Sequence, residues 1–499
     1  MYTIGIDSGT QSTKAIVVDL ETGEIVAQAQ EKYGVIPGLP AGHMEQDPQA
    51  WLDAVDATVG SCVVQLGDRR SAVVGIGVSG QQHGLVVLDA RDQPVRAAKL
   101  WCDTSTSAEC AEFEGAFGGT EGLIKKAGNA IPPGFTAPKI LWLKRNEAEN
   151  FAKTKSVLLP HDYINFHLTG VKRMEFGDAS GTGLLNVRER RWDPDLISFI
   201  DADVEGMLPE LGSSNEAHGT LRAALCEIWG LASDVVVSAG GGDNMMGAIG
   251  TGNLRQGVVT ASLGTSGTLY ACSESPIIDP RGEIAAFCDS TDRWMPLMCT
   301  MNVTVLTEQT RRVFGWELGE LEAQVNASEP GAGGLTFLPY LNGERTPNLP
   351  NGKGVIHGLT TDNMTSSNLA RAAMEGVTVG LAYGLVRLKD LGLEASEIRM
   401  TGGGSKSGAW RQIAADVFDT PVVCLSTAEG ASLGGAIQAA HCVAKAAGEA
   451  ANYEELAMRL VALDNSTRCE PRSQHRDVYA AQLDRHTALT RDLHGAGHL

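Results

Sequence analysis

An aspartate beside a glycine turn is the first pattern in this chain that could handle a phosphorylated ligand. Asp7 ends a run of alternating apolar residues and is followed by Ser8, Gly9 and Thr10. Backbone N–H groups in such a turn can point at an anion. A carboxylate beside the turn can hold Mg²⁺ against a bound phosphate, directly or through water. An ordinary turn aspartate explains the same pattern, so Asp7 alone leaves both interpretations open.

A similar turn occurs in the second half of the chain. The segment Gly264, Thr265, Ser266 and Gly267 separates two strand-like runs and repeats the glycine and threonine of the first turn. Two facing Gly-Thr hairpins suit a triphosphate, because their amides and the hydroxyls of Thr10, Thr265 and Ser266 are all donors. The repeat favours nucleotide binding and predicts two similar domains facing a cleft.

Asp243 is the candidate for acid–base chemistry. It follows Gly240-Gly241-Gly242, which lets the backbone pass close to a ligand, and it precedes Asn244 at the start of an expected helix. Phosphoryl transfer to an alcohol needs a carboxylate that accepts the hydroxyl proton as the oxygen attacks. A helix N-cap is the alternative interpretation.

Two polar segments are candidates for binding a sugar. Gln82 and His83 follow a buried strand over residues 73–78, where an amide and an imidazole could bind hydroxyl groups. Asp103, after Trp101 and Cys102, is a second candidate polar contact. A structural histidine and a surface aspartate beside a buried tryptophan are the alternatives.

One further glycine cluster could bind the nucleotide. It lies between an expected strand and an expected helix and consists of Gly402, Gly403 and Gly404. Such a loop could pass under an adenine ring and an α-phosphate, although strand–glycine–helix connections are common in proteins.

The elements that would carry these residues can be read from the periodicity. Alternating apolar residues predict a meander of strands at residues 2–6, 13–19 and 25–30, followed by a helix that begins at Asp47-Pro48. In the second half we expect strands at 257–263, 268–272 and 398–401, helices at 367–390, 407–418 and 431–446, and a polar, helical tail beyond residue 450. The opening order matches neither a dinucleotide-binding domain nor a TIM barrel.

Length and charge limit the classes of function. With 499 residues the chain should form more than one domain. Its formal charge of −20 argues against nucleic-acid binding and against adhesion to an anionic membrane. The turns at 8–10 and 264–267 contain no Lys or Arg, so phosphate binding there would depend on amides, hydroxyls and Mg²⁺.

Cysteine usage and the N-terminal segment bear on localisation. The ten cysteines include no Cys-x-x-Cys pair, and the N-terminal residues lack the pattern of a signal peptide. No uninterrupted apolar run reaches the roughly 18 residues of a membrane helix. We therefore expect a cytoplasmic protein with reduced thiols and no membrane partner.

Taken together, several segments resemble the FGGY family of carbohydrate kinases over nearly the whole chain. Residues 134–142 (GFTAPKILW) are similar to its first signature, and residues 354–359 with 368–375 are similar to its second. Within the family the match is closest to the xylulose kinases, through residues 45–48, 80–84, 133–139, 159–163, 240–244 and 340–347.

The resemblance implies an α/β fold of two actin-like ATPase (ribonuclease H-like) domains with an interdomain cleft. It implies domains at 1–250, on the sugar side, and 251–450, on the nucleotide side, with a helical tail at 451–499 packed on the second domain. It implies that ATP, as its Mg²⁺ complex, phosphorylates D-xylulose to D-xylulose 5-phosphate. Homodimers are common in the family, so a homodimer is compatible with the sequence.

The resemblance also assigns roles by position. Asp243 matches the general base, and the other substrate-binding candidates are Gln82, His83, Asn244 and Asp103. Asp7 matches the metal-associated aspartate. The nucleotide-binding positions are Gly9, Thr10, Gly264, Thr265, Ser266, Gly402, Gly403 and Gly404.

Two departures near the expected sugar site keep other acceptors open. Position 82 is Gln where xylulose kinases often carry Met, and the segment after Asp103 is Thr104-Ser105, without the basic residue of some members. The alternatives are a kinase for ribulose, L-xylulose or a sugar alcohol, and a non-catalytic nucleotide switch of the actin-like type. A glycerol kinase is disfavoured, because its Arg-Glu pair is absent at positions 82 and 83.

Overall fold

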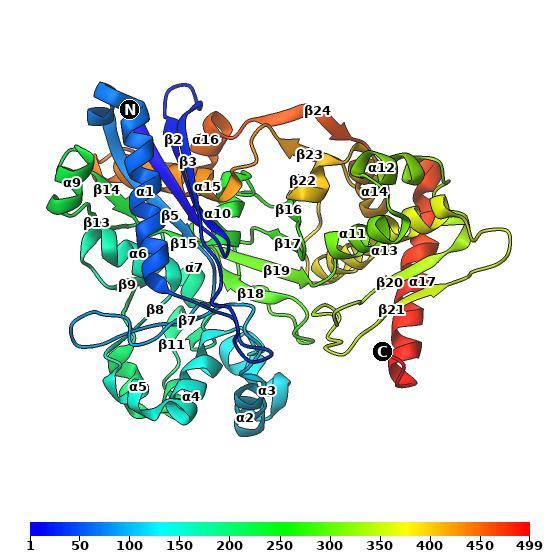
Figure 1. The fold of residues 1–499 in the computed structure, drawn as a ribbon, viewed down its shortest axis with the longest axis horizontal. Helices are drawn as coiled ribbons and strands as arrows, with labels where there is room; N and C mark the ends of the chain where they lie inside the picture. Colours follow the sequence, from blue (N-terminus) through cyan, green and yellow to red (C-terminus); the bar gives the residue numbers. More distant parts are fainter. The chain divides into compact units, whose positions relative to one another are not determined.

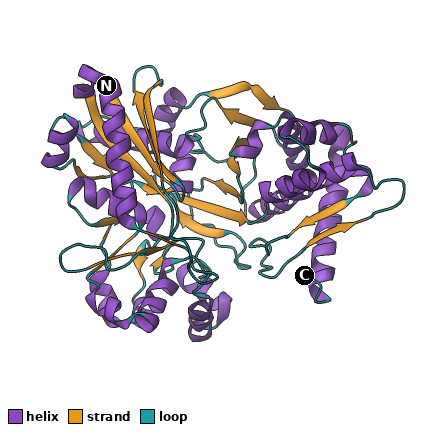
Figure 2. Ribbon diagram, viewed as in Figure 1, coloured by secondary structure: helices purple, strands orange, loops and turns teal.

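The computed structural model describes residues 1–499, which form two compact units (Figure 1). The first unit consists of Met1–Leu254, Cys272–Met295 and Glu429–Ala462, and the second of Arg255–Ala271, Pro296–Ala428 and Leu463–Leu499. Each unit is built from strands and helices, as Figure 2 shows by colour. The contiguous domains expected from the sequence stay a prediction, and each of the two units consists of three separate segments of the chain.

The first unit contains sixteen strands and twelve α-helices. The strands are β1 (Tyr2–Ser8), β2 (Ser12–Asp19), β3 (Ile25–Lys32), β4 (Glu45–Gln46), β5 (Val73–Gly80), β6 (Val86–Leu88), β7 (Ala98–Lys99), β8 (Ser156–Leu158), β9 (Arg173–Glu175), β10 (Leu185–Asn186), β11 (Arg191–Trp192), β12 (Glu210–Gly212), β13 (Ala217–Thr220), β14 (Val236–Ser238), β15 (Gly241–Gly242) and β18 (Ala285–Cys288). The helices are α1 (Pro48–Leu66), α2 (Ser107–Phe117), α3 (Gly119–Ala127), α4 (Thr136–Asn146), α5 (Ala148–Lys153), α6 (Pro160–Thr169), α7 (Phe176–Ala179), α8 (Pro194–Ile200), α9 (Ala223–Trp229), α10 (Asp243–Gly250), α15 (Gly430–Ala446) and α16 (Tyr453–Leu460).

The second unit has fewer elements. Its strands are β16 (Val258–Leu263), β17 (Gly267–Ala271), β19 (Trp294–Thr300), whose first two residues belong to the first unit, β20 (Thr336–Pro339), β21 (Gly354–His357), β22 (Glu397–Thr401), β23 (Val422–Leu425) and β24 (Leu463–Cys469). Its α-helices are α11 (Thr304–Phe314), α12 (Leu318–Asn326), α13 (Ser366–Asp390), α14 (Gly408–Phe418) and α17 (Arg476–Gly495).

The main sheets of the two units repeat one topology. In the first unit β3, β2 and β1 pair antiparallel, and β5 and β14 continue in parallel beside β1. In the second unit β19, β17 and β16 pair antiparallel, and β22 and β23 continue in parallel beside β16. This repeat confirms the expected fold class, an α/β protein with two actin-like ATPase domains.

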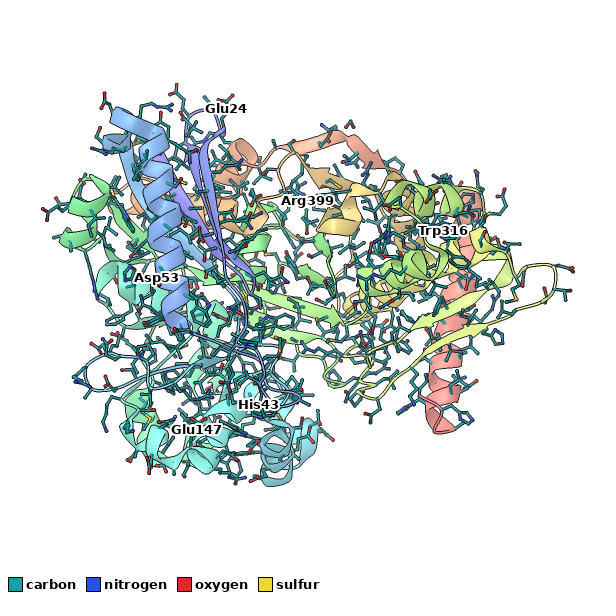
Figure 3. The ribbon with its side chains drawn as sticks, viewed as in Figure 1. Glu24, His43, Asp53, Glu147, Trp316 and Arg399 are labelled. Atoms are coloured by element: carbon teal, nitrogen blue, oxygen red, sulfur yellow. The ribbon has the colours of Figure 1, made fainter.

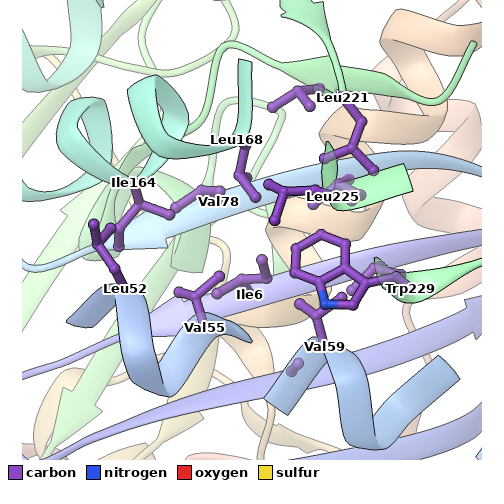
Figure 4. Packing of buried hydrophobic residues seen from close by; sticks show 14 of the residues in the cluster. Ile6, Leu52, Val55, Val59, Val78, Ile164, Leu168, Leu221, Leu225 and Trp229 are labelled. Atoms are coloured by element: carbon purple, nitrogen blue, oxygen red, sulfur yellow. The ribbon is translucent and has the colours of Figure 1, made fainter. Parts of the chain in front are cut away.

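The sheet of the first unit is covered on both faces, because its strands alternate their apolar side chains. Ile6 of β1 and Val78 of β5 pack against α1 and α6, together with Val55, Ile164 and Trp229 (Figure 4). On β2, Ala15 and Val17 belong to this same cluster.

The opposite face of this sheet packs against the helices α10, α15 and α16. Ile16 and Val18 of β2 lie with Met246 of α10 and with Leu433 and Ile437 of α15. Both faces are thus buried, as expected for the parallel part of an α/β sheet.

Helix α15 approaches its neighbours without intervening side chains. A Cβ atom on Gly5 of β1 would overlap the carbonyl oxygen of Ser432, and one on Gly434 would overlap the carbonyl oxygen of Met246 in α10. Helix α15 therefore determines the positions of both β1, which carries Asp7, and α10, which carries Asp243.

The segment beyond residue 450 differs from the sequence expectation. It contains the helices α16 and α17, but the strand β24 lies between them and pairs antiparallel with β23. The sequence of β24, LDNSTRC, is too polar to be recognised as a strand. The strand tolerates polar residues because it lies at the edge of its sheet with one neighbour.

One helix, α13, is long and apolar enough to span a membrane by length and composition alone, and 78% of its apolar window is buried inside the structure. Its buried residues include Arg371 and Glu375, which form an ion pair of 2.6 Å. Helix α13 is therefore a core helix of the second unit.

Candidate active site

The strand ends of the first unit bring five of the expected residues to one edge of its sheet. Asp7 at the end of β1 pairs with Ser79 of β5, and Ser79 pairs in turn with Gly241 of β15. Gln82 and His83 follow β5, and Asp243 and Asn244 follow β15. Because the carboxyl ends of parallel strands meet at one edge of a sheet, these five polar residues lie along the same edge.

Asp243 begins helix α10, but it does not cap it. The N-cap is Gly242, which has no side chain, and the Asp243 carboxylate accepts hydrogen bonds from the Asn244 backbone N–H (2.8 Å) and from Asn244 Nδ2 (2.9 Å). Burial of the carboxyl group and the nearby charge of Asp7 raise the pKa of Asp243 to about 7. A carboxyl with this pKa is matched to accepting a proton at neutral pH.

Gln82 is joined to the same group by Asn244. Asn244 Nδ2 donates to Gln82 Oε1 over 2.8 Å, so Gln82, Asn244 and Asp243 form one connected set. A Cβ atom on Gly242 would lie 2.5 Å from Gln82 Cγ, which explains why a glycine precedes Asp243. Gln82 Nε2 is buried and has no hydrogen-bond partner within the protein, so it is a donor available to a ligand.

His83 lies in the left-handed region of the backbone, with φ of 62°. Its ring stacks on Phe135 with 4.7 Å between centroids. Its carbonyl oxygen accepts hydrogen bonds from Lys139 Nζ (2.7 Å) and Thr136 Oγ1 (3.2 Å). A non-glycine residue at positive φ is uncommon, and such residues cluster at functional sites.

Asp7 is partly buried and accepts a hydrogen bond of 2.9 Å from Ser79 Oγ. Burial and the charge of Glu429 raise the pKa of Asp7, while Ser79 and Lys14 oppose the shift. Lys14 is already paired with Glu429 at 3.0 Å. The charge of Asp7 also raises the pKa of Asp243, and a divalent cation held by the Asp7 carboxylate would relieve this repulsion, so the residues fit Mg²⁺.

The first glycine turn is held by side chains of three residues from other segments of the chain, none of which was a candidate for nucleotide binding. Tyr33 Oη donates to the Gly9 carbonyl oxygen over 2.7 Å. Gln46 Nε2 donates to the Thr10 carbonyl oxygen over 2.6 Å, and Trp101 Nε1 donates to Thr10 Oγ1 over 3.1 Å. These three hydrogen bonds fix the conformation of the turn, as a preorganised anion site requires.

Asp103 has no hydrogen bond to this set. Its side chain is fully buried, and its carboxylate accepts hydrogen bonds from Lys99 Nζ (3.1 Å), the Met44 N–H (2.9 Å) and the Ser105 N–H (3.0 Å). Burial opposes ionisation, but these hydrogen bonds and the Lys99 charge hold the pKa of Asp103 below its ordinary value. Both carboxylate oxygens of Asp103 already have partners within the protein. Its expected contact with the sugar stays a prediction.

His43, Glu45 and Asp103 bring their ligand atoms close enough together to hold a metal ion (His43 is labelled in Figure 3). The buried ammonium group of Lys99 lies among them, 3.3 Å from His43 Nδ1, 3.3 Å from Glu45 Oε1 and 3.1 Å from Asp103 Oδ2. The lysine supplies the positive charge that a metal would supply, so this cluster is an internal ion pair.

The second unit brings its two glycine segments to one edge of its own sheet. The turn Gly264–Gly267 joins β16 to β17, and β16 pairs in parallel with β22, which leads into Gly402. A Cβ atom on Gly402 would lie 2.6 Å from the Leu263 carbonyl oxygen, next to Gly264. The expected nucleotide-binding residues of this unit are therefore neighbours.

These two glycine segments differ in how they are held. The carbonyl oxygens of Gly264 and Thr265 accept hydrogen bonds of 3.0 Å from Thr304 and Val303 at the start of α11. Gly402 has φ of 83°, whereas a Cβ atom on Gly403 would meet nothing within 4 Å. The loop at Gly403 thus has open space beside its backbone.

Comparisons with known proteins agree over most of the chain. Residues 2–250 match the N-terminal domain of the FGGY family of carbohydrate kinases, and residues 259–443 match its C-terminal domain. The chain is 43% identical to a xylulose kinase of Haemophilus influenzae over 88% of this chain and 90% of that protein. It is 37% identical to a xylulose kinase of Streptomyces coelicolor over 88% of this chain and 87% of that protein. It superimposes with a TM-score of 0.92 on a crystal structure described as a xyloylose kinase from Brucella ovis, with 32% identity, over 99% of this chain and all of that one.

Proposed function

Because this chain belongs to the FGGY family of carbohydrate kinases, we propose that it transfers the γ-phosphoryl group of ATP to D-xylulose, giving D-xylulose 5-phosphate and ADP. The observation that carries the proposal is the connected set of Asp243, Asn244 and Gln82, in which a carboxyl with a pKa of about 7 lies beside a buried amide donor. Relatives at up to 43% identity that are xylulose kinases support the choice of sugar.

In this proposal the residues divide the reaction between them. Gln82, His83 and Asn244 bind and orient the sugar, and Asp243 Oδ accepts the proton of the attacking hydroxyl group. Gly9 and Thr10 in the first unit, and Gly264, Thr265 and Ser266 in the second, donate amides and hydroxyls to the phosphates. Gly402, Gly403 and Gly404 accommodate the adenosine. Asp103 is the further candidate for a contact with the sugar.

Asp7 would hold Mg²⁺, together with oxygens of the nucleotide. The metal would neutralise negative charge on the phosphates. The turns at 8–10 and 264–267 contain no Lys or Arg that could do so in its place. We further propose a cytoplasmic enzyme, and a homodimer is compatible with the family.

Removing the metal is expected to abolish activity. With excess EDTA, ADP release should fall to background and return when Mg²⁺ is added beyond the chelator, because no basic residue of the two turns replaces the cation. The control is EDTA saturated with Mg²⁺ before it is added. Full activity in metal-free buffer would contradict the role of Asp7.

The pH profile should report Asp243. Since the base must be deprotonated and the pKa of Asp243 is raised to about 7, kcat/KM for the sugar should fall as the pH decreases through 7. The expected slope is about tenfold per pH unit. Residual activity of Asp243→Asn should be flat over the same range. If the variant retains this limb, another group is responsible, such as Glu175, whose pKa burial also raises to about 7.

The substrate itself is tested by a panel. ADP release should be measured with D-xylulose, L-xylulose, D-ribulose, L-ribulose, xylitol and glycerol, and the product of the preferred acceptor should be identified by NMR. We expect the highest kcat/KM with D-xylulose. A preference for another pentulose or a polyol would favour the alternative acceptor, which the free Nε2 donor of Gln82 supports. ATP hydrolysis without any phosphorylated sugar would contradict the kinase assignment.

A further inference from the structure

Lys139 of α4 is a fully buried lysine that the mechanism above does not use. Its side chain has no exposed surface, and its ammonium group forms no ion pair. It donates to two backbone carbonyl oxygens, those of His83 (2.7 Å) and Gly134 (2.6 Å). Burying an ammonium group costs free energy, and an apolar side chain of similar length would fill the same space without that cost.

The backbone of His83 is held at its carbonyl group. Its carbonyl oxygen accepts hydrogen bonds from Lys139 Nζ and from Thr136 Oγ1. The imidazole stacks on Phe135, and a Cβ atom on Gly181 would overlap it. A buried ammonium group thus holds the carbonyl oxygen of a residue whose φ is 62°.

We propose that Lys139 is the positioning residue for His83: its ammonium group holds the His83 carbonyl oxygen and so fixes the left-handed backbone that presents the imidazole to the sugar. This inference rests on the proposed function, in which His83 binds the acceptor. Lys139 is fully buried and its ammonium group donates to backbone carbonyl oxygens, so it is a positioning residue.

Two physical arguments explain how a lysine can act at this position. A hydrogen bond from a charged donor is stronger than one from a neutral donor, so an ammonium can offset the strain of a non-glycine residue at positive φ. Burial lowers the pKa of Lys139 to about 7, while the nearby Asp103 opposes this shift. Asp103, which is itself paired with Lys99, thereby stabilises the charge of Lys139.

The test compares Lys139→Met with Lys144→Met. Lys144 lies on the same helix and also donates to a carbonyl oxygen, that of Ile200 (2.5 Å), but it does not contact His83. For Lys139→Met we expect the KM for the sugar to rise about tenfold or more, with the KM for ATP within about twofold of wild type. Lys144→Met should change neither KM. A rise of both KM values by the same factor, or an unchanged sugar KM, would overturn the proposal.

Thr136→Val provides a second variant if Lys139→Met does not fold. It removes one hydroxyl that donates to the same carbonyl oxygen (3.2 Å) and nearly preserves the side-chain volume. The sugar KM should rise by about threefold, in the same direction as for Lys139→Met. An unchanged sugar KM in this variant would contradict the importance of the His83 carbonyl contact.

A direct measurement separates this inference from the proposed function. The imidazole resonance of His83 is assigned in the wild type by its loss in His83→Gln. Lys139→Met should shift that resonance, and Lys144→Met should not. If the wild type phosphorylates no sugar, the proposed function fails while this spectrum still tests the positioning. If the sugar is phosphorylated and the resonance does not move, the positioning inference alone is wrong.

Discussion

Sugar phosphorylation by Asp243→Asn is expected to fall by about 10³-fold in kcat, because the amide cannot accept the proton of the attacking hydroxyl group. Nucleotide binding should survive, since the expected ATP contacts are glycine amides and hydroxyls of other segments. The Asn side chain nearly preserves the volume of Asp and removes a carboxyl whose pKa burial and Asp7 raise to about 7. Coupled ADP release gives kcat, and calorimetry with an ATP analogue gives the affinity.

The matched control for this variant is Asp195→Asn. Asp195 also lies in the first turn of a short helix of the first unit, α8, but it is exposed and pairs with Lys126 on the surface. Exposed ion pairs contribute little, so kcat and the thermal midpoint should remain close to wild type. Turnover of Asp243→Asn at the wild-type rate would eliminate Asp243 as the general base.

Gly434→Ala should destabilise the protein by about 3 kcal/mol and reduce kcat by about 10²-fold. A Cβ atom at this position would overlap the carbonyl oxygen of Met246 and approach Gly250 N to 3.1 Å, so α10 and α15 must separate. Because Asp243 begins α10, the same separation displaces the general base. The free energy change is measured by urea unfolding and the rate by coupled ADP release.

Gly430→Ala tests whether the effect depends on the contact with α10. Gly430 lies at the start of the same helix, and the nearest atom to its added Cβ would be Thr251 Cγ2 at 3.7 Å, an ordinary contact. Its stability should change by less than about 1 kcal/mol, and its kcat should stay near wild type. Equal losses of stability and of kcat in both variants would show that the effect does not depend on the contact between Gly434 and α10.

The catalytic candidates could be chosen from the sequence because each is marked by a short pattern of neighbouring residues. Asp7, Asp243 and the turns at Gly264 and Gly402 combine a reactive or small residue with the end of a strand, and these patterns span fewer than about ten residues. The structure keeps each of them at a strand end. The topology was predictable for the same reason, since both sheets begin with adjacent strands joined by short turns.

Residues that position the site were not predictable, because their partners are distant in the chain. Trp101 lies 91 residues after Thr10, to which it donates, and Lys139 lies 56 residues after His83. Lysine is mostly a surface residue, so nothing in the local pattern indicates that Lys139 is fully buried. Asp103 is a second example. Its type and its place after Trp101 suggested a polar contact, but the sequence did not indicate that it is buried in an ion pair with Lys99.

The sequence by itself determined the chemistry that this protein can offer: carboxylates, amides and glycine turns at strand ends, with no basic residue in the turns. Only the tertiary structure decided how these groups behave. The pKa of Asp243 depends on burial and on Asp7, which lies 236 positions earlier in the chain. Their positions depend on α15, a helix near residue 440 that packs on β1 and α10 through glycines. Burial and charge act through space, so they are fixed only when distant segments of the chain meet.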